Sequence, residues 1–423
     1  MSLKISPMKK LLIAGATVSV AGLAALAAHG GVNSGQVVVP LAPPLPAPTS
    51  NAANVALPVR ADDPLPPPEV NAAPVALLYD LGSGRTLYAH NADTPFLPAS
   101  VTKTMTAFVA FEMLAKGELR EDQTITVSRE AWREWHSKGS RMFLSEGSKP
   151  TVHDLLMGIM NVSANDGAVV LAEGAGGSVA GWVEKMNDAA RRLGMTHSHF
   201  GTPNGWMDKG NTYVSANDLV KLASAMLTRY PEYYHRFVGQ PGMTWNGIAQ
   251  PNHDPTLGVV PGADGIKTGF TGEAHYNFLG SAQRDGRRLL MVLAGVPTPR
   301  ERTAAAKALL EWGFSAWEDK PLVPAGKALA QAQVQGGKVG SVDLVAPRDL
   351  FATMPRGAGA PATLRVIYNG PLVAPIAPGT PVAELEVRLG GAAPVRLPLT
   401  VAQAVEKGGI MDRVKFGFAR LIS

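Results

Sequence analysis

The chain has 423 residues, of which 46% are hydrophobic, and it carries a formal net charge of +5 at pH 7. This length and apolar content suffice for two folded domains with additional terminal segments. The absence of cysteine excludes disulfides, thiolate metal sites and a cysteine nucleophile. Most of the positive charge lies at the two ends, and no basic stripe interleaves with aromatic residues, so we expect no nucleic-acid partner.

The first 28 residues are typical of a secretory signal peptide. Three lysines precede an uncharged run over 11–28, and Ala25-Leu26-Ala27 fits the small residues of a cleavage site. An uncleaved N-terminal anchor is the alternative, because the run approaches the ~20 residues that span a bilayer. Residues 29–74 are rich in proline and alanine, which predicts an extended linker.

A first folded domain is expected over 75–320. Val75–Tyr79 and Arg85–Ala89 flank a glycine-rich turn and predict a β-hairpin. An apolar helix is predicted from Pro98 to Lys116, closed by Gly117. The stretch 152–230 is mostly helical by period. Its clearest apolar stripe, which we interpret as core packing, comprises Val179, Trp182, Val183, Met186 and Leu193.

The end of this domain predicts further strands and a helix. His275–Gln283 and Arg287–Val296 flank a second turn and predict another hairpin, and a helix is predicted over Arg300–Trp312. Strands at both ends of the domain with helices between them favour an antiparallel sheet built from its first and last segments. We therefore expect an α/β (α+β) domain with a helical subdomain.

A small all-β sandwich is predicted over 321–405. Leu385, Val387 and Leu389 alternate with charged residues, as on a half-buried strand, and Leu364–Tyr368 reads similarly. The final segment, 406–423, predicts a basic amphipathic helix, which fits a membrane interface. A terminal helix docked on the β domain is the alternative.

Ser100-Val101-Thr102-Lys103 is the first of three short motifs that carry chemistry. On a helix, residues three apart share one face, roughly 5–6 Å apart at Cβ, so the Ser100 hydroxyl would lie beside the Lys103 amine. This pairing of nucleophile and base suits acyl transfer without histidine. Desolvation and a second nearby cation, for which Lys267 is the natural candidate, would lower the pKa of Lys103.

The second and third motifs supply polar groups that such a reaction needs. Ser163-Ala164-Asn165 follows an apolar helix; Ser163 could relay a proton, and Asn165 offers a donor and an acceptor to a substrate amide. Lys267-Thr268-Gly269 reads as a strand whose charge and hydroxyl suit a substrate carboxylate. Backbone N–H groups of Ser100 and Phe270 are candidate oxyanion donors. Each motif alone is common, but their order and spacing together are improbable by chance.

From Val75 to Trp317 the chain resembles the D-alanyl-D-alanine carboxypeptidases of the low-molecular-mass penicillin-binding protein family. Pro98-Ala99-Ser100-Val101-Thr102-Lys103 is similar to the family's P-A-S-x-T-K, and Ser163-Ala164-Asn165-Asp166 to its S-x-N-D. Gly265-Ile266-Lys267-Thr268-Gly269-Phe270-Thr271 is similar to its G-I-K-T-G-[FHY]-T.

The resemblance implies a serine β-lactamase-like fold and a peptidoglycan stem peptide ending in D-Ala-D-Ala as substrate. It implies that Ser100 attacks the penultimate carbonyl, releases terminal D-Ala and passes the acyl group to water, and that β-lactam antibiotics acylate the same serine. It implies no cofactor and no metal. It places the protein in the bacterial periplasm, at the outer face of the cytoplasmic membrane.

The resemblance also assigns residues that would clamp the terminal carboxylate. Arg302 matches one arginine of the family, whereas a second arginine position in some members falls on His253. Histidine is mostly neutral at pH 7 unless a neighbour such as Asp254 raises its pKa. Carboxylate binding is therefore expected to be weaker or pH-sensitive here, unless His253 is merely a loop residue.

Three rival functions stay open at this point. A DD-endopeptidase that cleaves peptidoglycan crosslinks would use the same motifs. A β-lactamase would need a carboxylate that drives deacylation, and no convincing E-x-x-x-N pattern follows Asn165. A wall protein that only binds is disfavoured, because every polar residue of the three motifs is intact.

Overall fold

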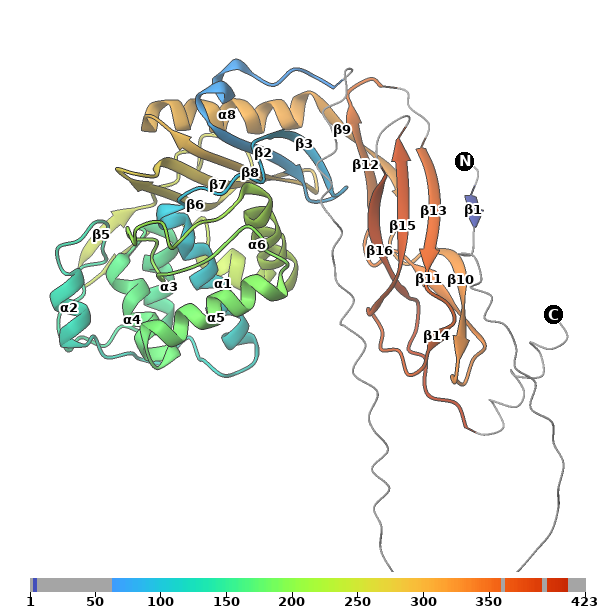
Figure 1. Cartoon of the computed structure of the whole chain (residues 1–423), viewed down its shortest axis with the longest axis horizontal. Helices are drawn as coiled ribbons and strands as arrows, with labels where there is room; N and C mark the ends of the chain where they lie inside the picture. The colour runs from blue at the N-terminus through green and yellow to red at the C-terminus, as the bar shows by residue number, and fades with distance from the viewer. Residues whose placement is uncertain (1–2, 6–62, 359–361, 390–393, 410–423) are drawn as a thin grey trace, which may run out of the picture.

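The computed structural model describes residues 3–5, 63–358, 362–389 and 394–409. Figure 1 shows two parts: a domain of sheet and helices, and an all-β domain after it. Apart from Leu3–Ile5, the predicted signal segment lies outside the described residues, as do residues 29–62 of the linker and residues 410–423 of the terminal helix. Within the described ranges, no helix has both the length and the apolar character needed to cross a membrane.

A five-stranded antiparallel sheet forms the centre of the first domain, in the strand order β3-β2-β8-β7-β6. Its hairpins β2–β3 and β7–β8 confirm the two predicted from sequence, and strands from both ends of the domain share the sheet as expected. β6 lies at one edge. The strands are β2 (Val75–Asp80), β3 (Arg85–His90), β6 (Ala263–Thr271), β7 (His275–Arg284) and β8 (Arg287–Val296).

Helices cover both faces of this sheet, so its central strands β2, β7 and β8 have buried runs without alternation. Figure 1 shows α8 (Pro299–Ser315) above the sheet and the other helices below it. Successive residues of a strand point to opposite faces. Leu77 accordingly packs in the core below the sheet, and Leu78 packs in the core under α8 with Leu309. α8 begins one residue before the predicted helix and ends three residues after it.

Seven helices and a small hairpin, β4 (Gly242–Trp245) with β5 (Ile248–Pro251), form the region below the sheet. Trp182 and Met186 are fully buried, which confirms their interpretation as core residues. The helices are α1 (Lys103–Ala115), α2 (Arg129–Trp135), α3 (Val152–Asn161), α4 (Asn165–Gly176), α5 (Val179–Arg192), α6 (Ala216–Arg229) and α7 (Pro231–Phe237).

The packed structure begins before Val75, inside the range expected to be linker. Pro68–Ala72 form a 3-10 helix that contacts α8, and Val70 and Ala73 are buried there. The proline-rich composition predicted an extended chain, but proline also suits the first turn of a helix. The apolar side of α8 supplies the contact, which no local pattern reveals.

The second domain is all-β, which confirms the predicted fold class. Its large sheet has the order β1-β13-β15-β16-β11-β10-β14, and β9 pairs with β12 in a second, two-stranded sheet. Residues of both sheets share one core, including Leu350, Leu385 and Leu399. The strands are β1 (Leu3–Ile5), β9 (Trp317–Val323), β10 (Ala328–Gln335), β11 (Ser341–Val345), β12 (Leu350–Pro355), β13 (Ala362–Tyr368), β14 (Leu372–Val373), β15 (Pro381–Leu389) and β16 (Val395–Val401).

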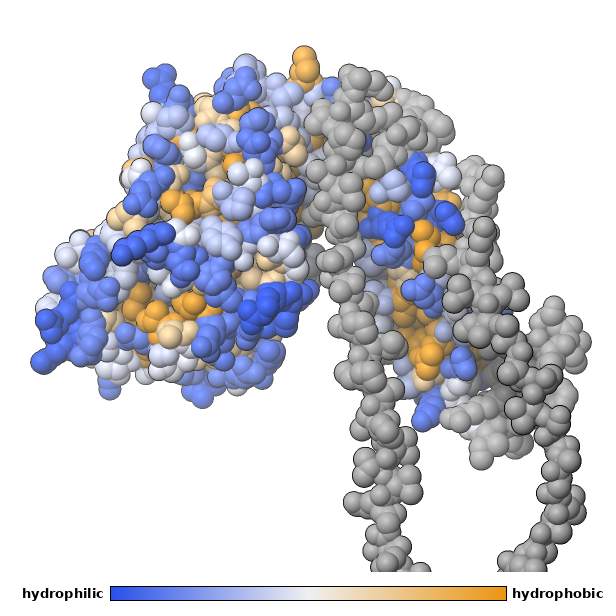
Figure 2. All heavy atoms as spheres, viewed as in Figure 1, coloured by the Kyte–Doolittle hydropathy of each residue, from blue (hydrophilic) through white to orange (hydrophobic). Residues whose placement is uncertain are grey.

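Strand β15 shows where the alternation rule is incomplete. Leu385 and Val387 are buried as predicted, but Glu386 between them is also buried. Its carboxylate is paired with Arg388 at 3.0 Å and with Arg396 at 3.6 Å. A buried charge is tolerated when it is paired. The face seen in Figure 2 is largely hydrophilic, with apolar residues confined to patches, as expected when each domain closes over its own core.

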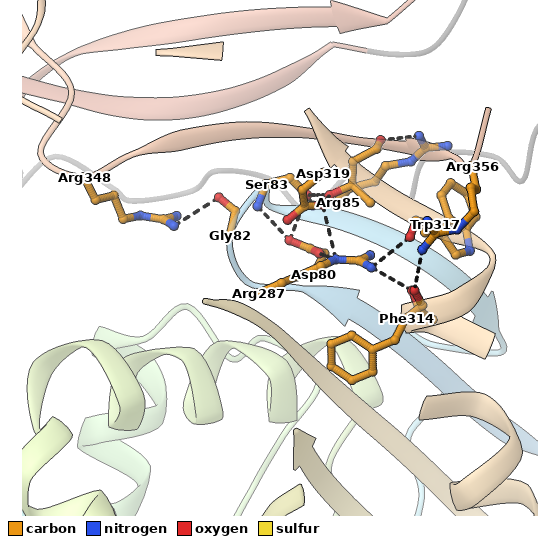
Figure 3. A network of polar contacts seen from close by, with 12 residues as sticks. Asp80, Gly82, Ser83, Arg85, Arg287, Phe314, Trp317, Asp319, Arg348 and Arg356 are labelled. Carbon is orange, nitrogen blue, oxygen red and sulfur yellow. Dashed lines mark hydrogen bonds and ion pairs between the residues drawn. The ribbon is translucent and has the colours of Figure 1, made fainter. Parts of the chain in front are cut away.

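A buried polar network joins the two domains beside the β2–β3 turn (Figure 3). Arg287 of β8 donates from Nε to Asp80 at 2.7 Å and lies 3.2 Å from Asp319 of β9. Arg85 of β3 donates to the backbone oxygen of Thr353, on β12, at 2.7 Å. The all-β domain is thus held against the end of the sheet where the β2–β3 turn and the start of β8 lie.

Candidate active site

Ser100 lies in a 3-10 turn, Ala99–Thr102, that leads directly into α1. We expected one helix to carry both Ser100 and Lys103, whereas α1 begins at Lys103. The two side chains still meet, because residues i and i+3 eclipse in a 3-10 turn. Lys103 Nζ lies 2.8 Å from Ser100 Oγ. Ala99 has φ +48°, a conformation that is costly for a residue other than glycine and often marks functional sites.

The Lys103 amine is completely buried and has three hydrogen-bond acceptors. Besides Ser100 Oγ, it donates to Asn165 Oδ1 and to the backbone oxygen of Asn204, both at 2.7 Å. Burial, and then the positive charge of Lys267, hold the pKa of Lys103 well below its ordinary value, and Asp166 opposes this shift. A neutral amine has two N–H donors and one lone pair. With its hydrogens on the two carbonyl oxygens, its lone pair faces Ser100.

The second motif lies in the turn between α3 and α4. Ser163 has φ +61° and lines the same cavity as Ser100. Asn165, the first residue of α4, accepts from Lys103 through Oδ1 and donates from Nδ2 to the backbone oxygen of Lys138 at 3.2 Å. Its amide therefore connects the base to a neighbouring loop.

Asp166 holds that loop, a contribution that we did not predict although the S-x-N-D motif contains it. Its buried carboxylate accepts from the backbone N–H groups of Met142 at 3.0 Å and Leu144 at 3.1 Å. Burial raises the pKa of Asp166, while these backbone N–H groups oppose the rise. Gly139 and Ser140, which precede the held segment, line the cavity.

The third motif lies on edge strand β6, next to the Ser100 turn. A Cβ added at Gly269 would lie 2.5 Å from the backbone oxygen of Pro98 and 3.2 Å from the amide nitrogen of Ser100. Only glycine permits this approach. Lys267 is buried behind the strand, and burial together with the charge of Arg302 lowers its pKa to about 7, a shift that Asp254 opposes. Thr268, Gly269 and Phe270 line the cavity.

Arg302 and His253 meet at the same end of the cavity. Arg302 is in the first turn of α8, with its guanidinium carbon 5.6 Å from the centre of the Tyr276 ring, and Tyr276 stacks on Phe270 at 4.3 Å. This aromatic contact leaves the hydrogen-bond donors of the guanidinium available to a ligand. Its Nε has no hydrogen-bond partner among the described residues.

His253 is neutral, and Asp254 does not reverse this. Desolvation on the cavity side, and then the charges of Lys267, Arg302 and Lys103, lower the pKa of His253 to about 4. The Asp254 carboxylate instead accepts from the N–H and the hydroxyl of Thr256, at 2.7 and 2.6 Å. Asp254 therefore does not raise this pKa, and burial of the imidazole is the largest cause of its low value.

These residues surround one cavity of about 470 Å³. Ser100, Ser163, Asn165, Thr268, Gly269, Phe270, His253 and Arg302 all line it, while Lys103 and Lys267 lie behind its wall. Lining residues that sequence reasoning missed include Gly139, Ser140, Trp206, Met207 and Thr271. Pro203-Asn204-Gly205 is a turn signal that could have indicated a loop before Trp206, but nothing local places that loop beside α1. No group of three or more His, Cys, Asp or Glu in the described ranges is placed to hold a metal ion.

Comparison with known families identifies the chain. Residues 62–298 match the D-alanyl-D-alanine carboxypeptidase family, Peptidase_S11, and residues 317–407 match the C-terminal domain of penicillin-binding protein 5. The chain belongs to the D-alanyl-D-alanine carboxypeptidase family. Members of Peptidase_S11 are serine hydrolases, so this chain is an enzyme of that class. The resemblance inferred from the three motifs is confirmed, as is the layout of a catalytic domain followed by a β domain.

Relatives of this family match most of the chain. The D-alanyl-D-alanine carboxypeptidase DacA of Haemophilus influenzae is 34% identical over 345 residues, which cover 80% of this chain and 86% of the relative. DacA of Escherichia coli is 33% identical over 355 residues, covering 81% and 87%. Both domains of the carboxypeptidase fold are thus included in the match.

Solved structures agree with this assignment. Penicillin-binding protein 5 of Haemophilus influenzae superposes with a TM-score of 0.69 at 34% identity, covering 81% of this chain and all of that one. Penicillin-binding protein 6B of Escherichia coli gives a TM-score of 0.63 at 28% identity, covering 79% and 98%. Penicillin-binding protein D2 of Listeria monocytogenes, solved with bound cefotaxime, gives 0.53 at 31% identity, covering 58% and 98%.

Proposed function

We propose that this protein is a serine D-alanyl-D-alanine carboxypeptidase that removes the terminal D-Ala from peptidoglycan stem pentapeptides through an acyl-enzyme on Ser100. One observation carries the proposal: the buried Lys103 amine lies 2.8 Å from Ser100 Oγ and has two other acceptors for its hydrogens. This arrangement directs the lone pair of a neutral amine at the serine hydroxyl. Nucleophile and base are therefore paired before substrate arrives.

In the acylation step, Ser100 Oγ bonds to the penultimate carbonyl carbon while its proton passes to Lys103. The N–H groups of Ser100 and Phe270 are the proposed donors to the oxyanion. The C–N bond then breaks, and the leaving amine of terminal D-Ala takes up a proton, relayed through Ser163. Water attacks the resulting ester, which releases the shortened peptide and restores the Ser100 hydroxyl.

Recognition of the substrate is assigned to Asn165, β6 and Arg302. Asn165 and the exposed edge of β6 at Thr268–Phe270 pair with the peptide backbone, as an edge strand can. The terminal carboxylate lies among Thr268, Lys267 and Arg302, with His253 as a neutral hydrogen-bonding group at the rim. A β-lactam carries a carboxylate and a strained amide, so it would occupy the same groups and acylate Ser100.

Muropeptide mass spectrometry tests the reaction. Purified pentapeptide muropeptides should lose one alanine on incubation with the protein, and Ser100→Ala should abolish the loss. Penicillin should add its full mass to the tryptic peptide that contains Ser100. Alanine release by Ser100→Ala at the wild-type rate would contradict the mechanism.

The rival functions are separated by two further substrates. Cleavage of crosslinked dimeric muropeptides at a rate similar to pentapeptides would favour a DD-endopeptidase. Rapid multiple turnover of nitrocefin would instead favour a β-lactamase, whereas a single slow acylation is the expected result. The match to the carboxypeptidase family over 62–298 supports the carboxypeptidase.

The placement of the protein in the cell rests on its terminal segments. We infer a signal peptide over 1–28, a linker that follows it and ends before the 3-10 helix at Pro68, and a membrane-interface segment over 410–423. The helix predicted from sequence began at 406, but Lys407 instead forms a β-bridge with Gly337, so the start of that prediction is wrong. Export to the bacterial periplasm and attachment to the outer face of the cytoplasmic membrane follow. Flotation of the mature protein with anionic vesicles tests the attachment, and removal of 410–423 should release it.

A further inference from the structure

Thr106 lies one turn after Lys103 on α1 and has no place in the mechanism so far. It is completely buried, and its Oγ1 donates to the backbone oxygen of Pro203 at 2.6 Å. The next residue of that loop, Asn204, supplies the backbone oxygen that accepts from Lys103 Nζ at 2.7 Å. Consecutive carbonyl groups of one loop thus bind consecutive turns of one helix.

Most other contacts of this loop fix its internal shape. Gly205 N–H donates to Thr202 Oγ1 at 3.0 Å, and Trp206 N–H donates to Asn204 Oδ1 at 3.0 Å. Gly205 lies directly against the backbone oxygen of Ala99, where no Cβ would fit. These contacts give the loop its turn. The Thr106 hydroxyl sets the distance between that turn and α1.

The position of the Asn204 carbonyl matters because it occupies one N–H of the amine. Asn165 Oδ1 occupies the second, and the lone pair then faces Ser100. If the Asn204 carbonyl moved, the amine could rotate and its lone pair would leave the serine hydroxyl. A hydrogen bond from the ammonium also favours the charged form, so the loss of this acceptor lowers the pKa of Lys103 further.

We propose that Thr106 is a positioning residue that holds the 202–206 loop so that the Asn204 carbonyl orients the Lys103 amine toward Ser100. The proposal rests on the proposed function, in which Lys103 is the base. Thr106 contacts neither substrate nor Ser100, and it acts through two backbone carbonyls. Its hydroxyl has one hydrogen, which the Pro203 oxygen accepts.

The chain provides a matched control on the same helix. Thr104 is also completely buried, but its Oγ1 has no hydrogen-bond partner among the described residues. Thr104→Val and Thr106→Val therefore make the same near-isosteric change, and only the second leaves a buried carbonyl without its donor. Thr106→Ser keeps the donor and is the rescue variant.

The test measures the rate at which a fluorescent penicillin acylates Ser100 in the full-length protein at several pH values. A separate titration measures the fraction of the protein that becomes acylated. We expect Thr106→Val to lower the maximal acylation rate about tenfold or more. In the plot of acylation rate against pH, the fall in rate on the acidic side should move to lower pH. Thr104→Val should match wild type. Thr106→Ser should restore both the maximal acylation rate and the pH at which the rate falls on the acidic side. Thermal melts confirm that each variant is folded.

Three outcomes would overturn the proposal. Thr106→Val could match Thr104→Val, it could reduce only the acylated fraction with rate and pH profile unaltered, or Thr106→Ser could fail to rescue. A Lys103→Ala variant distinguishes the role of Lys103 as base from the positioning role of Thr106. Full acylation by Lys103→Ala would overturn the base and the positioning role together, whereas an inactive Lys103→Ala with an unaltered Thr106→Val would overturn only the positioning role.

Discussion

Two buried lysines with different surroundings set the acid–base chemistry of the cavity. Burial and the charge of Lys267 hold the pKa of Lys103 well below its usual value, whereas the pKa of Lys267 falls to about 7 and Asp254 supports its charge. Two groups whose environments give them different pKa values can serve at the same pH as a base and as a cation. In the proposed mechanism Lys103 accepts the serine proton, and Lys267 binds the substrate carboxylate as long as it stays charged.

A pH dependence follows from Lys267. It is cationic below about pH 7 and neutral above, so binding of carboxylate substrates should weaken as pH rises through this value. We expect KM for a D-Ala-D-Ala peptide to rise by about tenfold per pH unit above the pKa while this charge is being lost. Measurement of kcat and KM between mildly acidic and alkaline pH checks this. A KM that stays constant through the neutral range would contradict it.

A second residue-scale prediction concerns His253, which is neutral with a pKa of about 4. His253→Arg places a permanent charge beside the carboxylate and should lower KM several-fold at mildly acidic pH. The added charge also lowers the pKa of Lys267, so the rise of KM should begin at lower pH. His197→Arg makes the same change at an exposed loop position outside the cavity lining and is the control. Equal behaviour of the two variants would contradict a role for His253 at the carboxylate.

At the scale of elements, the site depends on how closely edge strand β6 approaches the 3-10 turn of Ser100. Glycine at 269 permits the contact with Pro98 and Ser100. The turn, the strand and the α3–α4 loop come from three distant parts of the chain and meet below one end of the sheet. The cavity is therefore a product of element packing rather than of any single loop.

Gly269→Ala tests this packing. Its Cβ would lie 2.5 Å from the Pro98 backbone oxygen, so β6 must move away from Ser100. Displacement of about 1 Å at a reacting centre costs roughly 100-fold in rate, and we expect acylation by penicillin to fall by that order. Gly280→Ala on β7 is the control, because its Cβ would crowd only the flexible end of Met291 and would make ordinary contact with the Phe278 ring. Similar acylation rates for the two variants would contradict the argument.

At the scale of the whole molecule, the two domains share buried charges. Asp80 and Asp319 come from different domains and both lie against Arg287 (Figure 3). Burial and the charge of Asp80 raise the pKa of Asp319 even so. The two carboxylates therefore share one guanidinium, whose charge stabilises the junction between the domains.

Arg287→Met should destabilise the protein by about 3–5 kcal/mol, because it leaves the buried Asp80 and the partly buried Asp319 without their cation. A folded-state pKa above the unfolded one means that protonation stabilises the fold. The loss should therefore be smallest at mildly acidic pH and grow as pH rises through the pKa of Asp319. Thermal unfolding at several pH values measures this.

The matched control is Arg284→Met, on the preceding turn of the same hairpin. Arg284 also lies over the Phe314 ring, but its partner Glu311 is exposed. An exposed pair contributes about 0–1 kcal/mol, so this variant should melt near wild type at every pH. Equal destabilisation of both variants would show that the interdomain network is not the cause.

Periodicity and turn chemistry predicted the hairpins β2–β3 and β7–β8, helix α8 and the core face of α5, because these features depend on neighbours in sequence. They did not predict the 3-10 helix at Pro68–Ala72, which forms against α8, or the buried Glu386, which is paired by Arg388 and Arg396. Both exceptions depend on partners that tertiary packing supplies.

The sequence alone determined the class of chemistry. Ser100 and Lys103 are three residues apart, so local geometry brings them together, and the order of the three motifs was enough to indicate the family. Tertiary structure decided what those groups do in their environment. It placed the Asn204 carbonyl on the Lys103 amine, put the Lys267 pKa near 7 and kept His253 neutral beside Asp254. These properties depend on burial and on charges contributed by distant segments, and no local pattern encodes which segments meet.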